Sequence, residues 1–300
     1  MELVGAHVLA EGLAFPEGPV ALADGSVLVV EIEAGRLTRV AANGSVSVVA
    51  DVGGGPNGAA LGPDGAVYIC NNSGSPGHTT GRPGIQRVAL ETGAVEWLYT
   101  ECDGLPFARP NDLVFDHTGN FWFSDLAGQA VYYAKSDGSF VDRAWTGISS
   151  PNGVGLSPDG TALYASQTFT RQVLRRRIVS AGRLEPSPNH DIRALLRTGA
   201  ANADVLLVGL PGGQELDSLA VEADGSVCVA TLMESGITVV SPEGVVREKH
   251  TLPPALSDPV VTNICFGGDD MRTAFITLSK TGRLIACRWP RPGLRLNFQQ

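Results

Sequence analysis

The sequence predicts an all-β protein, a six-bladed β-propeller with four-stranded blades and a metal site at its centre. Its 300 residues include 37 glycines and 19 prolines, and only 18% of them are charged. This composition suits many short strands joined by tight turns. One short pattern recurs six times along the chain, and a β-rich run follows each copy. Such periodicity is typical of a propeller, in which each repeat forms one blade.

Each copy of the repeat has Glu, Asp or Asn at its third position and ends in a turn. The six copies are FPEGPVALADG from 15, GPNGAALGPDG from 55, RPNDLVFDHTG from 109, SPNGVGLSPDG from 150, ELDSLAVEADG from 215 and VTNICFGGDDM from 261. They start 40 to 65 residues apart, and most units contain further strand-like stretches such as GRLTRVAANGSVSVVA. Each unit is therefore long enough for the strands of one blade.

The two ends of the chain should meet, because a propeller that stays open leaves unpaired edge strands. The N-terminal run AHVLAEGL, residues 6–13, is the candidate fourth strand of the last blade, beside GRLIACRW at 282–289. The longest unit contains extra residues at 180–207, which we expect to form a surface insertion. No linker or shift in composition divides the chain, so we expect one domain over residues 1–300.

Composition and charge also limit the kinds of partner that the protein is expected to bind. The formal net charge of −9 argues against nucleic acid and against an anionic membrane surface. The N-terminus lacks the basic region and apolar core of a signal peptide, and no apolar run approaches the length of a membrane span. Five scattered cysteines without a C-x-x-C pair fit reduced thiols. We expect a cytoplasmic protein that acts on a small molecule, with no obligatory protein partner.

The third residues of the six copies should form a ring. If the units are equivalent, these residues surround one mouth of the central channel; they are Glu17, Asn57, Asn111, Asn152, Asp217 and Asn263. A turn explains a single Asn-Gly or Glu-Gly. It does not explain why Asp217, followed by Ser218, and Asn263, followed by Ile264, keep the same position.

Two carboxylates and four amide oxygens around one axis are typical ligands of a hard divalent cation. Ca²⁺ prefers about 6–8 oxygen ligands of mixed type. No His or Cys occupies the ring, which disfavours a structural zinc site. We therefore predict one divalent cation, with Ca²⁺ favoured and Mg²⁺, Mn²⁺, Zn²⁺ and Fe²⁺ left open.

Four stretches in order give the chain a family resemblance. With FPEGP, RPNDLVFDHTGNFWFSD, SPNGVGLSPDG and LDSLAVEADG, it resembles the senescence marker protein/gluconolactonase/luciferin-regenerating enzyme family of six-bladed propellers. The resemblance implies a divalent cation held by Glu17, Asn152 and Asp217. It implies that Asn111 is a further ligand or a substrate contact, and that Arg109 contacts substrate oxygens. It also implies a gluconolactonase-like, metal-dependent hydrolase that opens a sugar or other small lactone.

The residues support water-based rather than covalent hydrolysis. No G-x-S-x-G motif is present, and we assign to Asp217 the role of collecting the proton of the attacking water. Candidate substrate contacts are Arg109, Asn111, Asn57 and His78, the last in a glycine-rich loop. Two alternatives stay open: an organophosphate or ester hydrolase that uses the same site, and a non-catalytic calcium-binding propeller.

Overall fold

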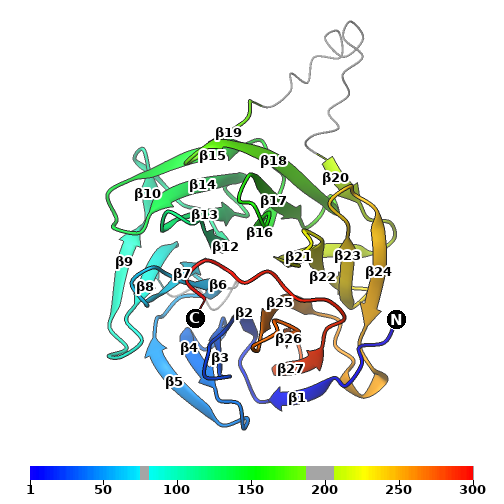
Figure 1. The fold of residues 1–300 in the computed structure, drawn as a ribbon. Helices are drawn as coiled ribbons and strands as arrows, with labels where there is room; N and C mark the ends of the chain where they lie inside the picture. The colour runs from blue at the N-terminus through cyan, green and yellow to red at the C-terminus, as the bar shows by residue number, and fades with distance from the viewer. Residues whose placement is uncertain (75–80, 187–205, 300) are drawn as a thin grey trace, which may run out of the picture.

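Six β-sheets surround a central axis, as Figure 1 shows in a computed structural model that describes residues 1–74, 81–186 and 206–299. In each sheet the strands follow one another from the axis outward and pair antiparallel. The innermost strand of each sheet contacts that of the next, and β25 contacts β2, so the ring of blades is closed. The predicted six-bladed propeller with four-stranded blades is confirmed.

The strands of the blades follow the repeats. Blade one has β2 (Pro16–Ala21), β3 (Val27–Glu31), β4 (Arg36–Val40) and β5 (Val46–Asp51); blade two has β6 (Pro56–Leu61), β7 (Val67–Asn71), β8 (Gly84–Val88) and β9 (Val95–Tyr99). Blade three has β12 (Pro110–Phe115), β13 (Asn120–Asp125), β14 (Ala130–Lys135) and β15 (Val141–Thr146). A small hairpin of β10 (Glu101–Cys102) and β11 (Leu105–Pro106) precedes blade three.

The second half continues the pattern. Blade four has β16 (Pro151–Leu156), β17 (Ala162–Gln167), β18 (Gln172–Ser180) and β20 (Leu206–Gly209), with β19 (Arg183–Leu184) paired to the far end of β18. Blade five has β21 (Gln214–Val221), β22 (Val227–Met233), β23 (Gly236–Val240) and β24 (Val246–Thr251). Blade six follows η1 (Pro254–Leu256) with β25 (Val261–Gly267), β26 (Thr273–Leu278) and β27 (Arg283–Arg288). Residues 187–205 of the predicted insertion lie outside the described residues.

The fourth strand of blade six comes from the N-terminus. The strand β1 (His7–Ala10) pairs antiparallel with β27, with His7 opposite Ala286 and Val8 opposite Ile285. In Figure 1 the blue β1 lies along the red β27. The predicted closure is confirmed, and it removes an unpaired strand edge that would otherwise invite association.

The core lies between neighbouring blades. Its largest fully buried side chains are aromatic, with Trp122, Trp289 and Tyr68 among them, and burial of such large side chains is a major contribution to core stability. All five cysteines are free thiols, as expected from their spacing. Within the described ranges, no helix has the length and apolar character needed to cross a membrane.

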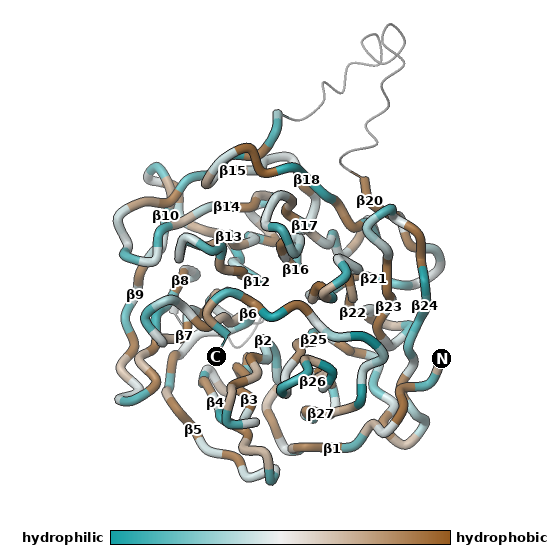
Figure 2. Tube along the Cα trace, viewed as in Figure 1, coloured by the Kyte–Doolittle hydropathy of each residue, from teal (hydrophilic) through white to brown (hydrophobic). Residues whose placement is uncertain are grey.

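The C-terminal segment, residues 290–299, crosses one end of the central channel. Its backbone and side chains bond to the ends of three innermost strands: Leu294 N donates to Val221 O, Asn297 Nδ2 to Phe115 O and Gln299 Nε2 to Phe266 O, at 2.8, 3.0 and 2.7 Å. Figure 2 shows apolar (brown) residues where this segment passes the centre. The segment therefore covers the end of the channel opposite to the starts of the innermost strands.

Glu222 anchors this segment. The carboxylate is fully buried, accepts a hydrogen bond from Trp289 Nε1 at 2.6 Å and pairs with Arg291, whose Nη2 lies 3.0 Å from Glu222 Oε1. A buried carboxylate is tolerated only with partners of this kind.

Replacing Arg291 should therefore destabilise the propeller. We expect Arg291→Met to lower the free energy of unfolding by about 2–4 kcal/mol, because it leaves Glu222 buried without its cation. The matched control is Arg177→Met, which removes an exposed pair with Glu185 and should cost less than about 1 kcal/mol. Urea unfolding of both variants measures the difference, and equal losses would contradict the anchoring role.

Candidate functional site

The six predicted ring residues all lie near the starts of innermost strands. Each is buried, with 2% to 9% of its surface exposed. In every blade the pairing between the innermost and second strands shifts register beside the ring residue, as between Glu17 and Val20 or between Leu216 and Leu219. Such a bulge takes the local residue out of the regular ladder and re-aims its side chain. The repeat detected in the sequence is therefore a repeat of bulged strand starts.

Polar residues at the ends of second strands hold the loops that enter the ring. Asp125, fully buried, accepts hydrogen bonds from the backbone amides of Ala108 and Arg109 at 2.8 and 2.7 Å. Equivalent bonds run from Ala14 N to Glu31, from Gly55 N to Asn71 and from Ser149 N to Gln167. The backbone of Arg109, the predicted substrate contact, is thus fixed two residues before Asn111.

Direct hydrogen bonds connect several ring residues and their neighbours. Asn263 Nδ2 donates to Glu17 Oε2 at 3.0 Å, which joins the last blade to the first. Asn152 Nδ2 donates to Thr168 Oγ1 at 3.1 Å, and its Oδ1 accepts a bond from Ser218 Oγ at 3.4 Å. Within the buried polar cluster of the ring, these bonds join blade six to blade one and blade four to blade five.

The carboxylates of this cluster are held in an unfavourable environment. Burial raises the pKa of Glu17 from 4.5 to about 6, against the opposing effect of its hydrogen bond from Asn263. Burial, together with the nearby charge of Glu17, raises the pKa of Asp217 well above its usual value. These directions show that Glu17 and Asp217 lie close enough to repel each other.

A third carboxylate, Asp112, was missed by the sequence reasoning. It follows Asn111 at a position where three other copies have glycine, and its pKa is raised from 3.8 to about 7 by burial and then by Glu17. The signal was present: this is the only one of the six copies with a charged residue directly after the ring residue. In Gly58, a Cβ would come within 2.5 Å of Asp112 Cα, which shows how closely adjacent strands approach at this level.

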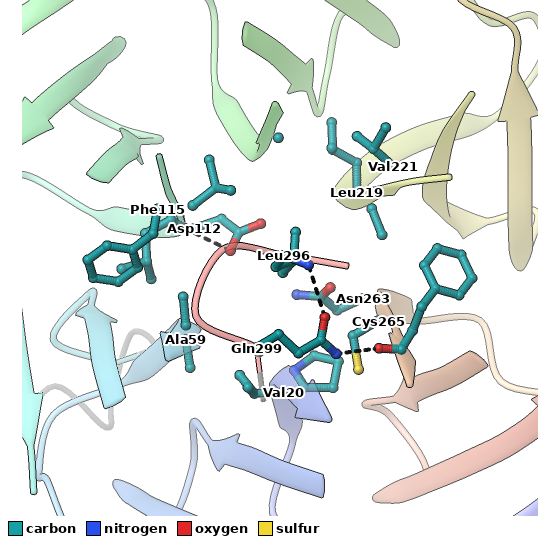
Figure 3. Close-up of a pocket in the computed structure, with 18 of the residues that line it drawn as sticks. Val20, Ala59, Asp112, Phe115, Leu219, Val221, Asn263, Cys265, Leu296 and Gln299 are labelled. Atoms are coloured by element: carbon teal, nitrogen blue, oxygen red, sulfur yellow. Dashed lines mark hydrogen bonds between the residues drawn. The ribbon is translucent and has the colours of Figure 1, made fainter. Parts of the chain in front are cut away.

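Below the ring lies a cavity of about 80 Å³ inside the channel, enough for several water molecules. Figure 3 shows Asp112 and Asn263 facing it, with Leu296 and Gln299 of the C-terminal segment across it. Apolar residues such as Val20, Leu113 and Leu219 make up most of its wall. The polar ring therefore lies over an apolar channel.

The chemistry of the ring fits a cation. None of the salt bridges formed by the described residues involves Glu17, Asp112 or Asp217. Asn57 Oδ1 and Asn111 Oδ1 are buried there without any hydrogen-bond partner, which is costly unless something else binds them. Among the described residues, no three His, Cys, Asp or Glu side chains are grouped so that they could bind a metal ion by themselves. A cation would therefore depend on these amide oxygens as well as on the carboxylates.

The open mouth adds an aromatic residue that the sequence reasoning also missed. Phe169 is 65% exposed and follows Thr168, which bonds to the side chain of Asn152 and, through its carbonyl oxygen, to Leu216 N at 3.2 Å. It thus stands between the strands of Asn152 and Asp217. An exposed aromatic side chain beside a polar cluster offers an apolar surface to a ligand. His78 lies outside the described residues.

Comparison with known proteins shows the family of the chain. A model of the SMP-30/Gluconolactonase/LRE-like region matches residues 15–280. The chain belongs to this family. The resemblance drawn from the four sequence stretches is thereby confirmed, although a family match of this kind assigns no role to a single residue.

Individual relatives are distant. A gluconolactonase of Zymomonas mobilis is 27% identical over 91% of this chain and 78% of its own length. A 6-deoxy-6-sulfogluconolactonase of Pseudomonas putida is 28% identical over 63% of this chain and 61% of its own length. Among solved structures, the calcium-binding protein regucalcin of Agrobacterium tumefaciens superposes with a TM-score of 0.74 at 20% identity, covering 99% of both chains. The structural likeness concerns the fold.

The buried carboxylates predict an unusual pH dependence of stability for the metal-free protein. The pKa values of Glu17 and Asp112 are raised in the folded state, to about 6 and about 7. The folded state is therefore favoured most below pH 4, where both carboxyl groups are protonated. This contribution to the free energy of unfolding is lost as pH rises through the pKa values of the folded state, and for Glu17 the loss is about 2 kcal/mol. Turn carboxylates with lowered pKa values, such as Asp24 and Asp159, change stability only below about pH 4.

We therefore expect the chelator-treated protein to be less stable at pH 7.5 than at pH 5.5 in urea unfolding. The Glu17→Gln variant, which cannot ionise, should show a weaker dependence over the same interval. A wild-type stability that rises between these two pH values would contradict the described electrostatics.

Proposed function

We propose that this protein is a divalent-cation-dependent hydrolase that opens a lactone ring at the propeller mouth. The observation that carries the proposal is the ring itself. At or next to the starts of the innermost strands lie three buried carboxylates without a basic partner and two buried amide oxygens without a hydrogen-bond partner. Membership of the SMP-30/Gluconolactonase/LRE-like family and relatives named as lactonases support the reaction class.

Glu17, Asn152 and Asp217 would hold the cation, with the free Oδ1 of Asn111 as a further donor. When bound, the cation would supply Lewis-acid polarisation of the lactone carbonyl. Ca²⁺ is the favoured ion because the donors are all oxygens of mixed charge. The preference for Ca²⁺ over Mg²⁺ or Mn²⁺ is part of the proposal.

Asp217 is the residue that accepts the proton of the attacking water. As a ligand of a dication Asp217 would have a low pKa and be a weak base, so it could take this proton only because the cation acidifies the water. Asn152 donates a hydrogen bond that orients the carboxylate. Arg109, held through its backbone by Asp125, presents a forked donor suited to substrate oxygens and to the carboxylate of the product. Asn57 completes the polar side of the mouth.

The test is hydrolysis by metal-stripped protein on a lactone panel, with Ca²⁺, Mg²⁺, Mn²⁺, Zn²⁺ and Fe²⁺ added back singly. The panel contains sugar lactones and simple aliphatic and aromatic lactones, with esters and an organophosphate beside them. We expect ring opening to return with one or more cations. Turnover of only the ester or the organophosphate would move the function to that hydrolase class. Tight cation binding without any turnover would favour the non-catalytic propeller.

Asp217 should be essential for turnover and dispensable for folding. We expect Asp217→Ala to lower kcat for the best lactone at least 100-fold, the usual range for loss of a general base being about 10²–10⁴. The control is Asp224→Asn in the turn that follows the same strand, where the carboxylate accepts a bond from Ser226 N and pairs with Arg247, away from the ring. An Asp217→Ala enzyme with full kcat would exclude this role.

Phe169 should favour lactones that carry an apolar substituent. Phe169→Ala should raise KM for an aromatic lactone by about 5- to 10-fold, the value of one partly buried apolar contact, and change KM for a sugar lactone less than twofold. Phe140→Ala is the control, because this exposed phenylalanine lies at the β14–β15 turn, away from the ring. Equal effects on both substrates would remove Phe169 from substrate selection.

A further inference from the structure

Three buried serines donate to the backbone of the next blade at the level of the ring. Ser124 Oγ donates to Asn152 O at 2.5 Å, and Ser166 Oγ donates to Asp217 O at 2.6 Å. Ser279 Oγ donates to Pro16 O at 2.7 Å, the carbonyl of the peptide that precedes Glu17. Each serine belongs to the blade before the one that it contacts.

The pattern is selective. The three strands that receive these bonds are those of Glu17, Asn152 and Asp217. Before the other three ring residues, the position equivalent to Ser124 is occupied by Val30, Cys70 and Ala230. Among the described residues no hydroxyl of a preceding blade bonds to the backbone of Asn57, Asn111 or Asn263. The hydroxyls thus coincide with the strands of the proposed cation ligands.

Two of the serines join a pair of innermost strands. Ser124 Oγ also accepts a bond from Asp112 N at 3.1 Å, and Ser166 Oγ accepts one from Gly153 N at 2.8 Å. Both serines are fully buried. One hydroxyl therefore fixes the separation between a strand of its own blade and the ring residue of the next.

We propose that Ser124 and Ser166, with Ser279 in the corresponding role for Glu17, are positioning residues that set the spacing of the three cation-binding strands. They do not touch the ion. They hold the backbone of its ligands, and a cation site loses affinity when its donors depart from their places by about 0.5 Å. This inference rests on the proposed function, since it concerns the cation of that same site.

A purely structural role would give a different result. A buried hydroxyl that only satisfies backbone groups contributes to folding, and its loss would destabilise the metal-free and the metal-bound protein alike. A positioning role adds a loss of cation affinity beyond the change in stability. The two roles separate when cation binding and metal-free stability are measured on the same variants.

The experiment uses Ser124→Ala and Ser166→Ala in the full chain. Calcium binding is measured by calorimetry on stripped protein, and metal-free unfolding is followed in urea. We expect the Kd for Ca²⁺ to rise at least tenfold in each variant. Cys70→Ala is the matched control: it removes the Sγ at the equivalent position before Asn111 and should leave Kd within twofold.

Two further substitutions keep the test decisive if an alanine variant fails to fold. Ser166→Thr retains the hydroxyl and should restore Kd to within threefold of wild type. Ser166→Cys retains the size with a weaker donor, as in Cys70, and should bind Ca²⁺ more weakly than the threonine variant. Equal Kd values in the threonine and cysteine variants would overturn the positioning role.

The outcomes also separate this inference from the proposed function. If wild type binds Ca²⁺ and the serine variants bind it equally well, the serines are structural and only this inference fails. If wild type binds none of the five cations, the proposed metal site fails and the positioning role fails with it. A rise in Kd without a matching change in the control supports both.

Discussion

The close approach of six innermost strands around one axis is the constraint on which the rest of the structure depends. At Gly18, Gly58 and Gly153 a Cβ would lie 2.5 Å from a backbone atom of the next strand, so larger residues are excluded there. This proximity brings side chains from six distant segments into one cluster. It also requires a closed circle, which the pairing of β1 with β27 completes.

The same proximity explains the electrostatics of the site. Glu17, Asp112 and Asp217 come from different blades and are buried together, and each pKa is raised. A fold that buried these groups for stability alone would pair them with a base or replace them. Their retention beside two unpartnered amide oxygens is consistent with a site built to bind a cation, in which local stability is given up for function.

The two ends of the central channel differ in structure. At one end, bulged strand starts aim polar side chains toward the axis, and second-strand residues such as Asp125 hold the loops that enter the ring. At the other end, the C-terminal segment covers the apolar channel and is anchored to the buried Glu222. The polar side chains of the ring therefore lie at the end of the channel that the C-terminal segment does not cover.

Sequence by itself determined the number of blades, the closing strand and the register of the ring, because each depends on a local pattern repeated along the chain. The turn after each innermost strand and the polar residue before it are neighbours in sequence. Only the tertiary structure showed that Asp112 joins the carboxylates, that two amide oxygens lack partners and that Ser124 and Ser166 bridge blades. These features arise between residues of different repeats, and their contacts exist only once the ring has closed.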